Sequence, residues 1–179
     1  LRKAFQWAAK HDLKIVLDFH GLPGSQNGKD HSGQVGPVRL YQRENQQQAL
    51  DTLEYMAQTY GHEPALIGLE LINEPRAKFC LWRLLRYYDK AIALVAPYLR
   101  PEAKIIVSDA FRPLAIAKKL PNRPYSNRLV LDVHLYQVYS RSDQRHSFDR
   151  HVAIADESWW DLIDAIQKFV PVMVGEWSA

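Results

Sequence analysis

The sequence of 179 residues has only one cysteine and no long apolar run. Cys80 has no second cysteine in the chain with which to form a disulfide, and its apolar neighbours favour a small core residue over a reactive thiol. No stretch approaches the ~20 apolar residues that a membrane-spanning helix needs. No signal peptide is visible either. Because Leu1 already belongs to an amphipathic pattern and Ala179 directly follows an apolar run, we expect both ends to be cut from a longer chain.

The sequence also lacks an excess of charge of one sign. Its 23 basic and 20 acidic residues give a formal net charge of +3, and the basic residues are scattered. Because nucleic-acid-binding proteins usually concentrate basic residues on one face, we expect no nucleic-acid partner. Hydrophobic residues make up 47% of the chain, which is typical of a globular domain with its own core.

Short apolar runs alternate with amphipathic segments along the chain. Apolar runs of this kind favour parallel strands buried on both faces, and the helices between them indicate an α/β fold of βαβ units. Five such units fit either an open doubly wound sheet or part of a (β/α)8 barrel, since a complete barrel takes about 250 residues. The predicted helices are residues 1–10, 44–60, 81–99, 113–119 and 158–169, and the predicted strands are residues 15–17, 65–71, 105–108, 129–133 and 172–175.

Each predicted strand is followed by a polar or ionisable side chain. The carboxyl ends of the strands of a barrel form one rim, where catalytic groups gather. A single polar residue at the end of a strand can be there only because the strand ends at the solvent-exposed surface. The same pattern after five strands favours a functional rim. The residues concerned are Asp18, His20, Asn73, Glu74, Asp109, His134, Tyr136 and Glu176.

Two of these residues are glutamates with unusual neighbours, Glu74 in Asn-Glu-Pro and Glu176 in Gly-Glu-Trp. Cleavage of a glycosidic bond needs two carboxyl groups, which stand ~5–5.5 Å apart in retaining enzymes. Two carboxylates at this short distance repel each other, and the repulsion raises the pKa of one of them. The pair therefore predicts a glycosidase, provided that the fold brings the two strands together.

Five motifs, in this order, resemble glycoside hydrolase family 5 and, within it, the exo-β-1,3-glucanase branch. The resemblance runs from about Leu13 to Ala179 and implies a (β/α)8 TIM barrel, present as an incomplete segment with about five βα units. Residues 1–179 would then be a single partial catalytic domain covering the third to seventh strands of the barrel. The motifs are DFHGLPGSQNG (18–28), GLELINEP (68–75), SDAF (108–111), DVHLYQVYS (132–140) and GEWSA (175–179).

The resemblance also implies roles for individual residues. Glu74 would be the acid/base and Glu176 the nucleophile, and Asn73 would hold the sugar 2-hydroxyl. A hydroxyl of Tyr136 that donates to Glu176 would keep the nucleophile ionised. The remaining sugar contacts that we expect are His20, Asp30, His134, Tyr136, Tyr139 and Trp177.

The loop at residues 21–33 contains four glycines but fails the P-loop pattern, because Asp30 follows Lys29 where a serine or threonine should stand. The loop also departs from the fungal enzymes that it resembles. They carry phenylalanine at the positions of Lys29 and Tyr139, as an aromatic clamp, and asparagine at the position of His31. These differences bear on the β-1,3 preference and the exo mode of action rather than on the retaining chemistry.

The resemblance implies a monomeric glucan exo-1,3-β-glucosidase that releases glucose from β-1,3-glucan without metal or cofactor, secreted or associated with the cell wall. A relative acting on another β-glucan, a mannan or a glycolipid is an alternative, as is an inactive fragment or a sugar-binding relative. A metal-dependent hydrolase is a weaker alternative, since no H-x-H or H-E-x-x-H spacing is present. Five strands alone would leave two unpaired sheet edges, so we expect the isolated chain to fold poorly.

Overall fold

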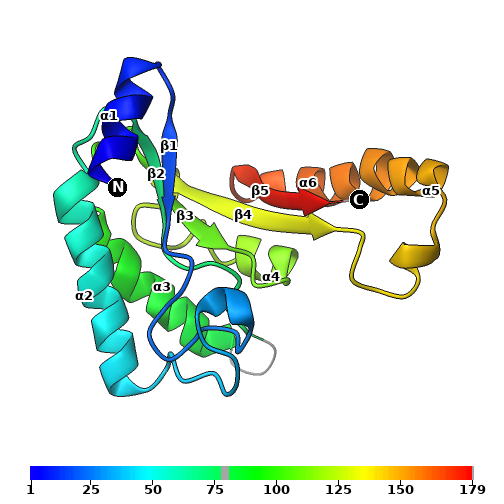
Figure 1. Cartoon of the computed structure of the whole chain (residues 1–179), viewed down its shortest axis with the longest axis horizontal. Helices are drawn as coiled ribbons and strands as arrows, with labels where there is room; N and C mark the ends of the chain where they lie inside the picture. Colours follow the sequence, from blue (N-terminus) through cyan, green and yellow to red (C-terminus); the bar gives the residue numbers. More distant parts are fainter. Residues whose placement is uncertain (78–80, 179) are drawn as a thin grey trace.

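The computed structural model describes residues 1–77 and 81–178. Cys80, predicted to be a small core residue, lies outside the described residues, and so does Ala179. Five parallel strands form one sheet in chain order (Figure 1). They are β1 (Ile15–Asp18), β2 (Leu66–Glu70), β3 (Lys104–Ser108), β4 (Leu129–Tyr136) and β5 (Val172–Ser178).

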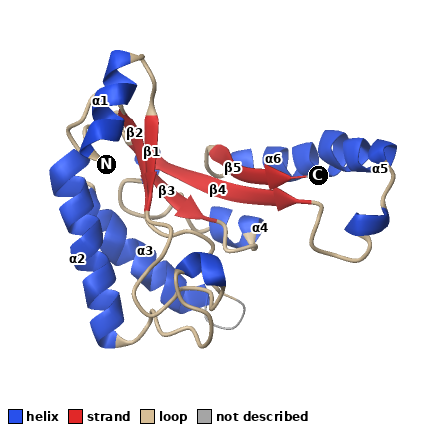
Figure 2. Ribbon diagram, in the orientation of Figure 1, coloured by secondary structure: helices blue, strands red, loops and turns tan. Residues whose placement is uncertain are grey.

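Helices connect the strands, and the sheet curls into a half barrel (Figure 2). The helices α2 and α3 pack against each other, whereas α6 runs alongside β5 (Figures 1 and 2). The helices are α1 (Arg2–Lys10), α2 (Arg43–Tyr60), α3 (Leu81–Val95), α4 (Pro113–Ala117), α5 (Phe148–Ala153) and α6 (Trp160–Gln167), with a π-helical turn, η4 (Ile154–Trp159), between the last two.

The apolar positions of α3 recur at helical spacing and are buried in the core. Leu84, Tyr88, Ala91 and Val95 are all fully buried, which gives the helix one continuous apolar face. Burying a side chain of this size stabilises the fold by about 1.5–3 kcal/mol. The helix ends at Val95 rather than at the predicted residue 99, because a turn precedes the Arg100-Pro101 step.

Two buried tyrosines of α3 fix the ends of the strands that carry polar residues. The hydroxyl of Tyr87 donates to the carbonyl of Leu71, 3.1 Å away, and that of Tyr88 donates to the carbonyl of Ser108, 2.7 Å away. A buried hydroxyl needs such a partner, because an unpaired one costs about 1–3 kcal/mol. The helix therefore anchors the carboxyl ends of β2 and β3.

Two strands extend further than the sequence predicts. β4 runs to Tyr136 instead of residue 133, and β5 runs to Ser178 instead of residue 175. His134, Tyr136 and Glu176 are thus strand residues rather than loop residues that follow a strand. The two strands stabilise each other by pairing over this added length, from His134 opposite Glu176 to Tyr136 opposite Ser178.

The helical region before β5 is also longer than predicted. Its apolar pattern predicts one helix over residues 158–169, but helical structure begins at Phe148 and continues through η4 into α6. Ser147 begins it, since its side chain accepts a hydrogen bond from the backbone N–H of Arg150. None of the helices described has the length and apolar character that crossing a membrane would require.

Candidate active site

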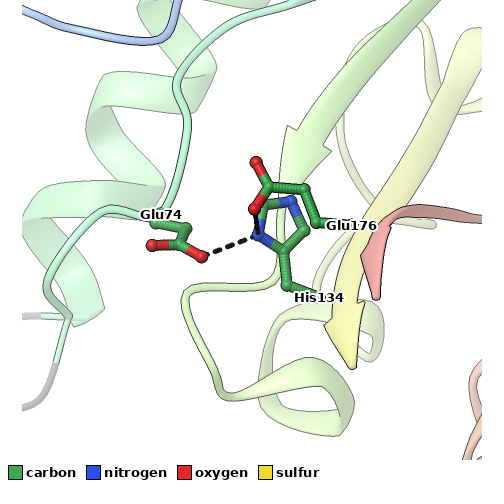
Figure 3. Close-up of side chains that lie close together, drawn as sticks. All are labelled: Glu74, His134 and Glu176. Carbon is green, nitrogen blue, oxygen red and sulfur yellow. Dashed lines mark hydrogen bonds and ion pairs between the residues drawn. The ribbon is translucent and has the colours of Figure 1, made fainter. Parts of the chain in front are cut away.

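Three ionisable side chains meet near the carboxyl ends of the strands (Figure 3). Glu74 follows β2, whereas His134 and Glu176 lie on the adjacent strands β4 and β5. Nδ1 of His134 lies 2.8 Å from Oε1 of Glu74 and 3.4 Å from Oε2 of Glu176. One carboxylate oxygen of each glutamate and one nitrogen of His134 lie within 4.8 Å of one another. The curl of the sheet thus brings together two carboxyl groups that are far apart in the sequence.

The backbone of Glu74 has an unusual conformation. Its φ of +41° lies in the left-handed region, which residues with a side chain rarely adopt. Two side chains from the loop after β1 hold this segment: Gln26 Nε2 donates to the carbonyl of Asn73 at 2.9 Å, and Asn27 Nδ2 donates to that of Glu74 at 3.1 Å. Such strain persists only where the surroundings enforce it, and it is concentrated at functional sites.

A β-bulge directs the side chain of Glu176. Val133 of β4 pairs with Val174 of β5, but the next pair is His134 with Glu176, so that Gly175 is the extra residue. A bulge changes the direction in which the following side chain points. Without it, the alternation of the strand would turn Glu176 away from His134.

Gly175 and Tyr136 also determine the surroundings of the Glu176 side chain. A Cβ at Gly175 would overlap the carboxylate of Asp132, and the backbone N–H of Gly175 donates to Oδ1 of Asp132 at 2.7 Å. The hydroxyl of Tyr136 donates to Oε2 of Glu176, which is the contact that the sequence predicts. This donor stabilises the ionised form of the Glu176 carboxyl group.

The pKa of Glu74 differs from the expectation that repulsion between the two glutamates would raise it. Burial does raise the pKa of Glu74, but the hydrogen bond from His134 and the charges of His134, His31 and His20 outweigh burial and lower it. Glu74 is therefore a stronger acid than an ordinary glutamic acid in this structure.

The pKa of Glu74 is lowered because His134 is an imidazolium cation bound between carboxylates. Burial lowers the pKa of His134, but hydrogen bonds to Asp132 and Glu74, followed by the charges of Asp132 and Glu176, raise it to about 10. Nε2 of His134 lies 3.2 Å from Oδ2 of Asp132, and both side chains are almost fully buried. At neutral pH His134 is therefore a cation that holds three acidic groups together.

Two buried acidic residues that we did not predict as part of the site, Glu70 and Asp132, lie beside these residues. Asp18, Glu70 and Asp132 line one cavity together with Glu176. Burial, then the charges of Asp132 and Asp18, raise the pKa of Glu70 to about 9. Oε1 of Glu70 is buried and has no hydrogen-bond partner among the described residues. The alternation of Asp132, His134 and Tyr136 along one strand was the signal that could have placed Asp132 in the site.

Two cavities flank His134. The larger, of about 1150 Å3, is lined by Glu74 but not by Glu176, and the smaller, of about 290 Å3, is lined by Glu176 but not by Glu74. His134 lines both of them. The two carboxyl groups therefore open into different spaces on either side of this residue.

The other predicted contacts occupy different places around these cavities. Asn73 is buried and lines the smaller cavity, and its Nδ2 lies 3.3 Å from Nε2 of His20, whose Nδ1 lies 2.6 Å from Oδ2 of Asp18. Asp30 and Tyr139 line the larger cavity.

Trp177 has a different environment. Its side chain is 68% exposed and lines neither of the two cavities, since it alternates along β5 with Glu176. Asp109, which the rim pattern also includes, is buried; burial raises its pKa to about 6, although its carboxylate accepts a hydrogen bond from the N–H of Phe111.

The cluster of Glu74, His134 and Glu176 is compact enough to surround a divalent cation. Both ring nitrogens of His134 already lie within hydrogen-bond distance of carboxylate oxygens, however. A metal ion would have to displace the proton between Nδ1 and Oε1 of Glu74. The arrangement fits a protonated histidine better than a metal ligand.

Comparison with known proteins identifies the family of the chain. The sequence profile described as cellulase, glycosyl hydrolase family 5, matches residues 1–179. The chain therefore belongs to glycosyl hydrolase family 5. A glucan 1,3-beta-glucosidase of Schwanniomyces occidentalis is 33% identical over 183 residues, which cover 100% of this chain and 42% of that protein. The chain thus spans less than half the length of this curated relative.

Solved structures share the fold. A Pseudomonas stutzeri endoglucanase matches with a TM-score of 0.71 at 21% identity, over 99% of this chain and 55% of that protein. A rutinosidase from Aspergillus niger matches with a TM-score of 0.68 at 23% identity, over 95% and 50% of the two chains. The five parallel strands are thus a half barrel that corresponds to part of a TIM barrel, as the resemblance of the five motifs implies, and not an open doubly wound sheet.

Proposed function

We propose that this chain carries both catalytic carboxyl groups of a retaining β-glycoside hydrolase. The observation that supports this most directly is the approach of Glu74 and Glu176 to within 4.8 Å. That separation fits the ~5–5.5 Å of retaining enzymes and is too short for the water that inverting enzymes place between the carboxyls, which needs ~6.5–9.5 Å.

The two cavities support an assignment of the two sides of the proposed reaction. Glu74 opens into the larger cavity, where the leaving group would lie, and Glu176 opens into the smaller one, where the cleaved sugar would lie. Glu176 attacks the anomeric carbon while Glu74 donates a proton to the glycosidic oxygen, and the C–O bond breaks. Glu74, now ionised, then takes a proton from the water that attacks the same carbon and releases Glu176 from the glycosyl ester.

The hydrogen bonds agree with these roles. Tyr136 donates to Glu176 and stabilises its ionised, nucleophilic form. His134 occupies Oε1 of Glu74, which leaves Oε2 free for the leaving group. Because the cationic His134 lowers the pKa of Glu74, we expect its acid form, and therefore kcat/KM, to be favoured on the acid side of neutrality.

For the substrate, we propose β-1,3-glucan cleaved from its non-reducing end to release glucose, with a protein that is secreted or associated with the cell wall. The resemblance to the glucan 1,3-beta-glucosidases supports this proposal. Asn73, His20, Asp30 and Tyr139 would then contact sugar hydroxyls or sugar faces.

The test is hydrolysis of laminarin and of an aryl β-glucoside by the full-length protein that contains this chain. We expect glucose as the first product from laminarin, with the β configuration retained when NMR follows the reaction. Products of several sugar units would contradict the exo mode, and an inverted first product would contradict double displacement.

A second candidate is hydrolysis of another β-glycoside. Lys29 and His31 line the larger cavity, where the fungal enzymes carry a phenylalanine and an asparagine, and the solved structures with this fold include an endoglucanase and a rutinosidase. Faster cleavage of cellulose oligomers or of a rutinoside than of laminarin would favour this candidate. A chelator should leave either activity unchanged, whereas a loss of activity that zinc restores would support a metal mechanism.

A further inference from the structure

His31 lies on the leaving-group side of the site, next to the oxygen of Glu74 that His134 leaves free. Its Nε2 is 3.4 Å from Oε2 of Glu74, and its side chain is 37% exposed. His31 lines the larger cavity together with Glu74. Glu74 thus has one histidine at each carboxylate oxygen, one buried and one open to the cavity.

Hydrogen bonds within the loop hold the position of His31. His31 belongs to a short 3-10 turn, η1 (Asp30–Ser32). The hydroxyl groups of the buried residues Ser25 and Ser32 lie 2.6 Å apart, and that of Ser32 also donates to the carbonyl of Lys29 at 2.6 Å. The backbone N–H of His31 donates to Oδ1 of Asp30 at 2.9 Å.

Asn27 determines which form of His31 fits this geometry. Oδ1 of Asn27 accepts a hydrogen bond from the N–H of Lys29, and its Nδ2 donates to the carbonyl of Glu74. The amide is thereby oriented so that Nδ2 also faces Nε2 of His31, 2.8 Å away. Only a neutral imidazole, with its lone pair on Nε2, can accept that hydrogen bond.

Protonation of His31 would reverse this arrangement. A hydrogen on Nε2 cannot be directed at the N–H donor of Asn27, because two donors repel each other. It would instead be donated to the other neighbour of Nε2, which is Oε2 of Glu74. Oε2 is the oxygen that must give its proton to the leaving group. A protonated His31 therefore favours the carboxylate form of Glu74, and a neutral His31 leaves Oε2 free to carry a proton.

We propose that His31 is a positioning residue that selects between two hydrogen-bond arrangements at Oε2 of Glu74 and so controls whether Glu74 is ready to act as an acid. This inference rests on the proposed function. Histidine suits such a role because its charge changes between pH 5 and 8. Among the described residues, the other ionisable groups near Glu74 or His31 include His20 and Asp109 after β1 and β3, His134 and Tyr136 on β4, Glu176 on β5, and Lys29 and Asp30 in the loop. Arg76, Arg112 and Tyr139 line the same cavity as Glu74 and His31.

The experiment compares the pH profile of kcat/KM for the wild-type full-length protein with those of His31→Gln and His31→Asn, with an aryl β-glucoside as substrate. These variants cannot form the protonated state that favours the carboxylate of Glu74, so the pKa of Glu74 should rise and the limb at which activity falls with rising pH should move up by ~0.5–1 unit. At a pH above that limb, kcat/KM expressed as a fraction of its maximal value should be ~3–10-fold higher for each variant than for the wild type. His62→Gln, on the exposed turn after α2, is the matched control and should leave the limb in place.

The outcomes separate this inference from the proposed function. An inactive wild-type protein would contradict the proposed function. An active wild type whose His31 variants lose rate equally at every pH, with the limb unmoved, would contradict the role of His31 and indicate a structural effect only. Should both variants fail to fold, NMR of the wild type decides: the Glu74 carboxyl signal must show a second titration step at the pH at which the His31 ring nitrogens titrate, and a single step would overturn the proposal.

Discussion

At the scale of single residues, the site contains one buried cation, His134, surrounded by several acidic side chains. His134 lies between Asp132 and Glu74 and close to Glu176, and it keeps these carboxylates together where they would otherwise repel one another. Tyr136 adds a neutral donor to Glu176 alone. The two catalytic glutamates of the proposal thus share His134 but differ in their other partners. Glu74 has His31 beside it, and Glu176 has a phenol whose own pKa is raised by burial and by Glu176.

Exchange of each glutamate for alanine should identify its role. Glu176→Ala removes the nucleophile, so we expect the turnover of an aryl β-glucoside to fall at least ~10³-fold. Azide should restore turnover and give an α-glycosyl azide, because the small anion attacks from the side that the carboxylate has vacated. The matched variant Glu74→Ala should instead give a β-glycosyl azide, and the same product from both variants would show that the roles are assigned wrongly.

The raised pKa of His134 predicts how stability depends on pH. Because the folded state raises this pKa to about 10, from about 6.5 in an unfolded chain, the stabilising contribution is complete below pH ~6.5 and is lost as the pH rises through about 10. His134→Gln should therefore lower the free energy of unfolding of the full-length protein by ~1–3 kcal/mol at pH 6, and by less at pH 10. Urea unfolding at the two pH values measures this, and an equal loss at both would contradict the charged state of His134.

At the scale of secondary-structure elements, the pairing of β4 with β5 decides where the nucleophile of the proposal points. The bulge at Gly175 shifts the register by one residue, and its N–H bonds directly to Asp132 on the neighbouring strand. The two strands can approach each other here only because residue 175 has no side chain.

Gly175→Ala should therefore damage both stability and activity. The added methyl group overlaps the carboxylate of Asp132, so we expect a loss of ~1–3 kcal/mol in the free energy of unfolding and a drop in kcat/KM of at least ~10-fold. A double-mutant cycle with Asp132→Ala is the control. If the overlap is the cause, removing the Asp132 side chain must cost less in the Gly175→Ala background than in the wild type, and strictly additive losses would contradict this explanation.

At the scale of the whole molecule, the five strands form half of a closed structure. β1 and β5 each pair with one neighbour only in the described part of the chain, and four acidic residues line the smaller cavity. In a barrel both edges would be paired, because closure removes them. The glucan 1,3-beta-glucosidase of Schwanniomyces occidentalis is more than twice as long as the segment that aligns with this chain.

The 179-residue polypeptide produced by itself should accordingly be aggregation-prone, should unfold without a sharp cooperative transition and should not hydrolyse an aryl β-glucoside. Two open edges and the uncompensated burial of Glu70 both oppose a stable monomer. Thermal unfolding followed by circular dichroism, with the full-length protein as control, measures the difference. A soluble 179-residue monomer with a sharp transition and hydrolytic activity would show that half the barrel is sufficient.

The sequence by itself determined the five βα units, the parallel sheet and the pair Glu74 and Glu176, because apolar runs, helical spacing and short motifs are local properties of the chain. The tertiary structure decided what depends on neighbours distant in sequence. It set the bulge that turns Glu176 towards His134, the cationic state of His134 that lowers the pKa of Glu74, the burial of Glu70, and the contact between His31 and Glu74. Register and burial are fixed only when separate strands pack together, and the pKa values follow from them.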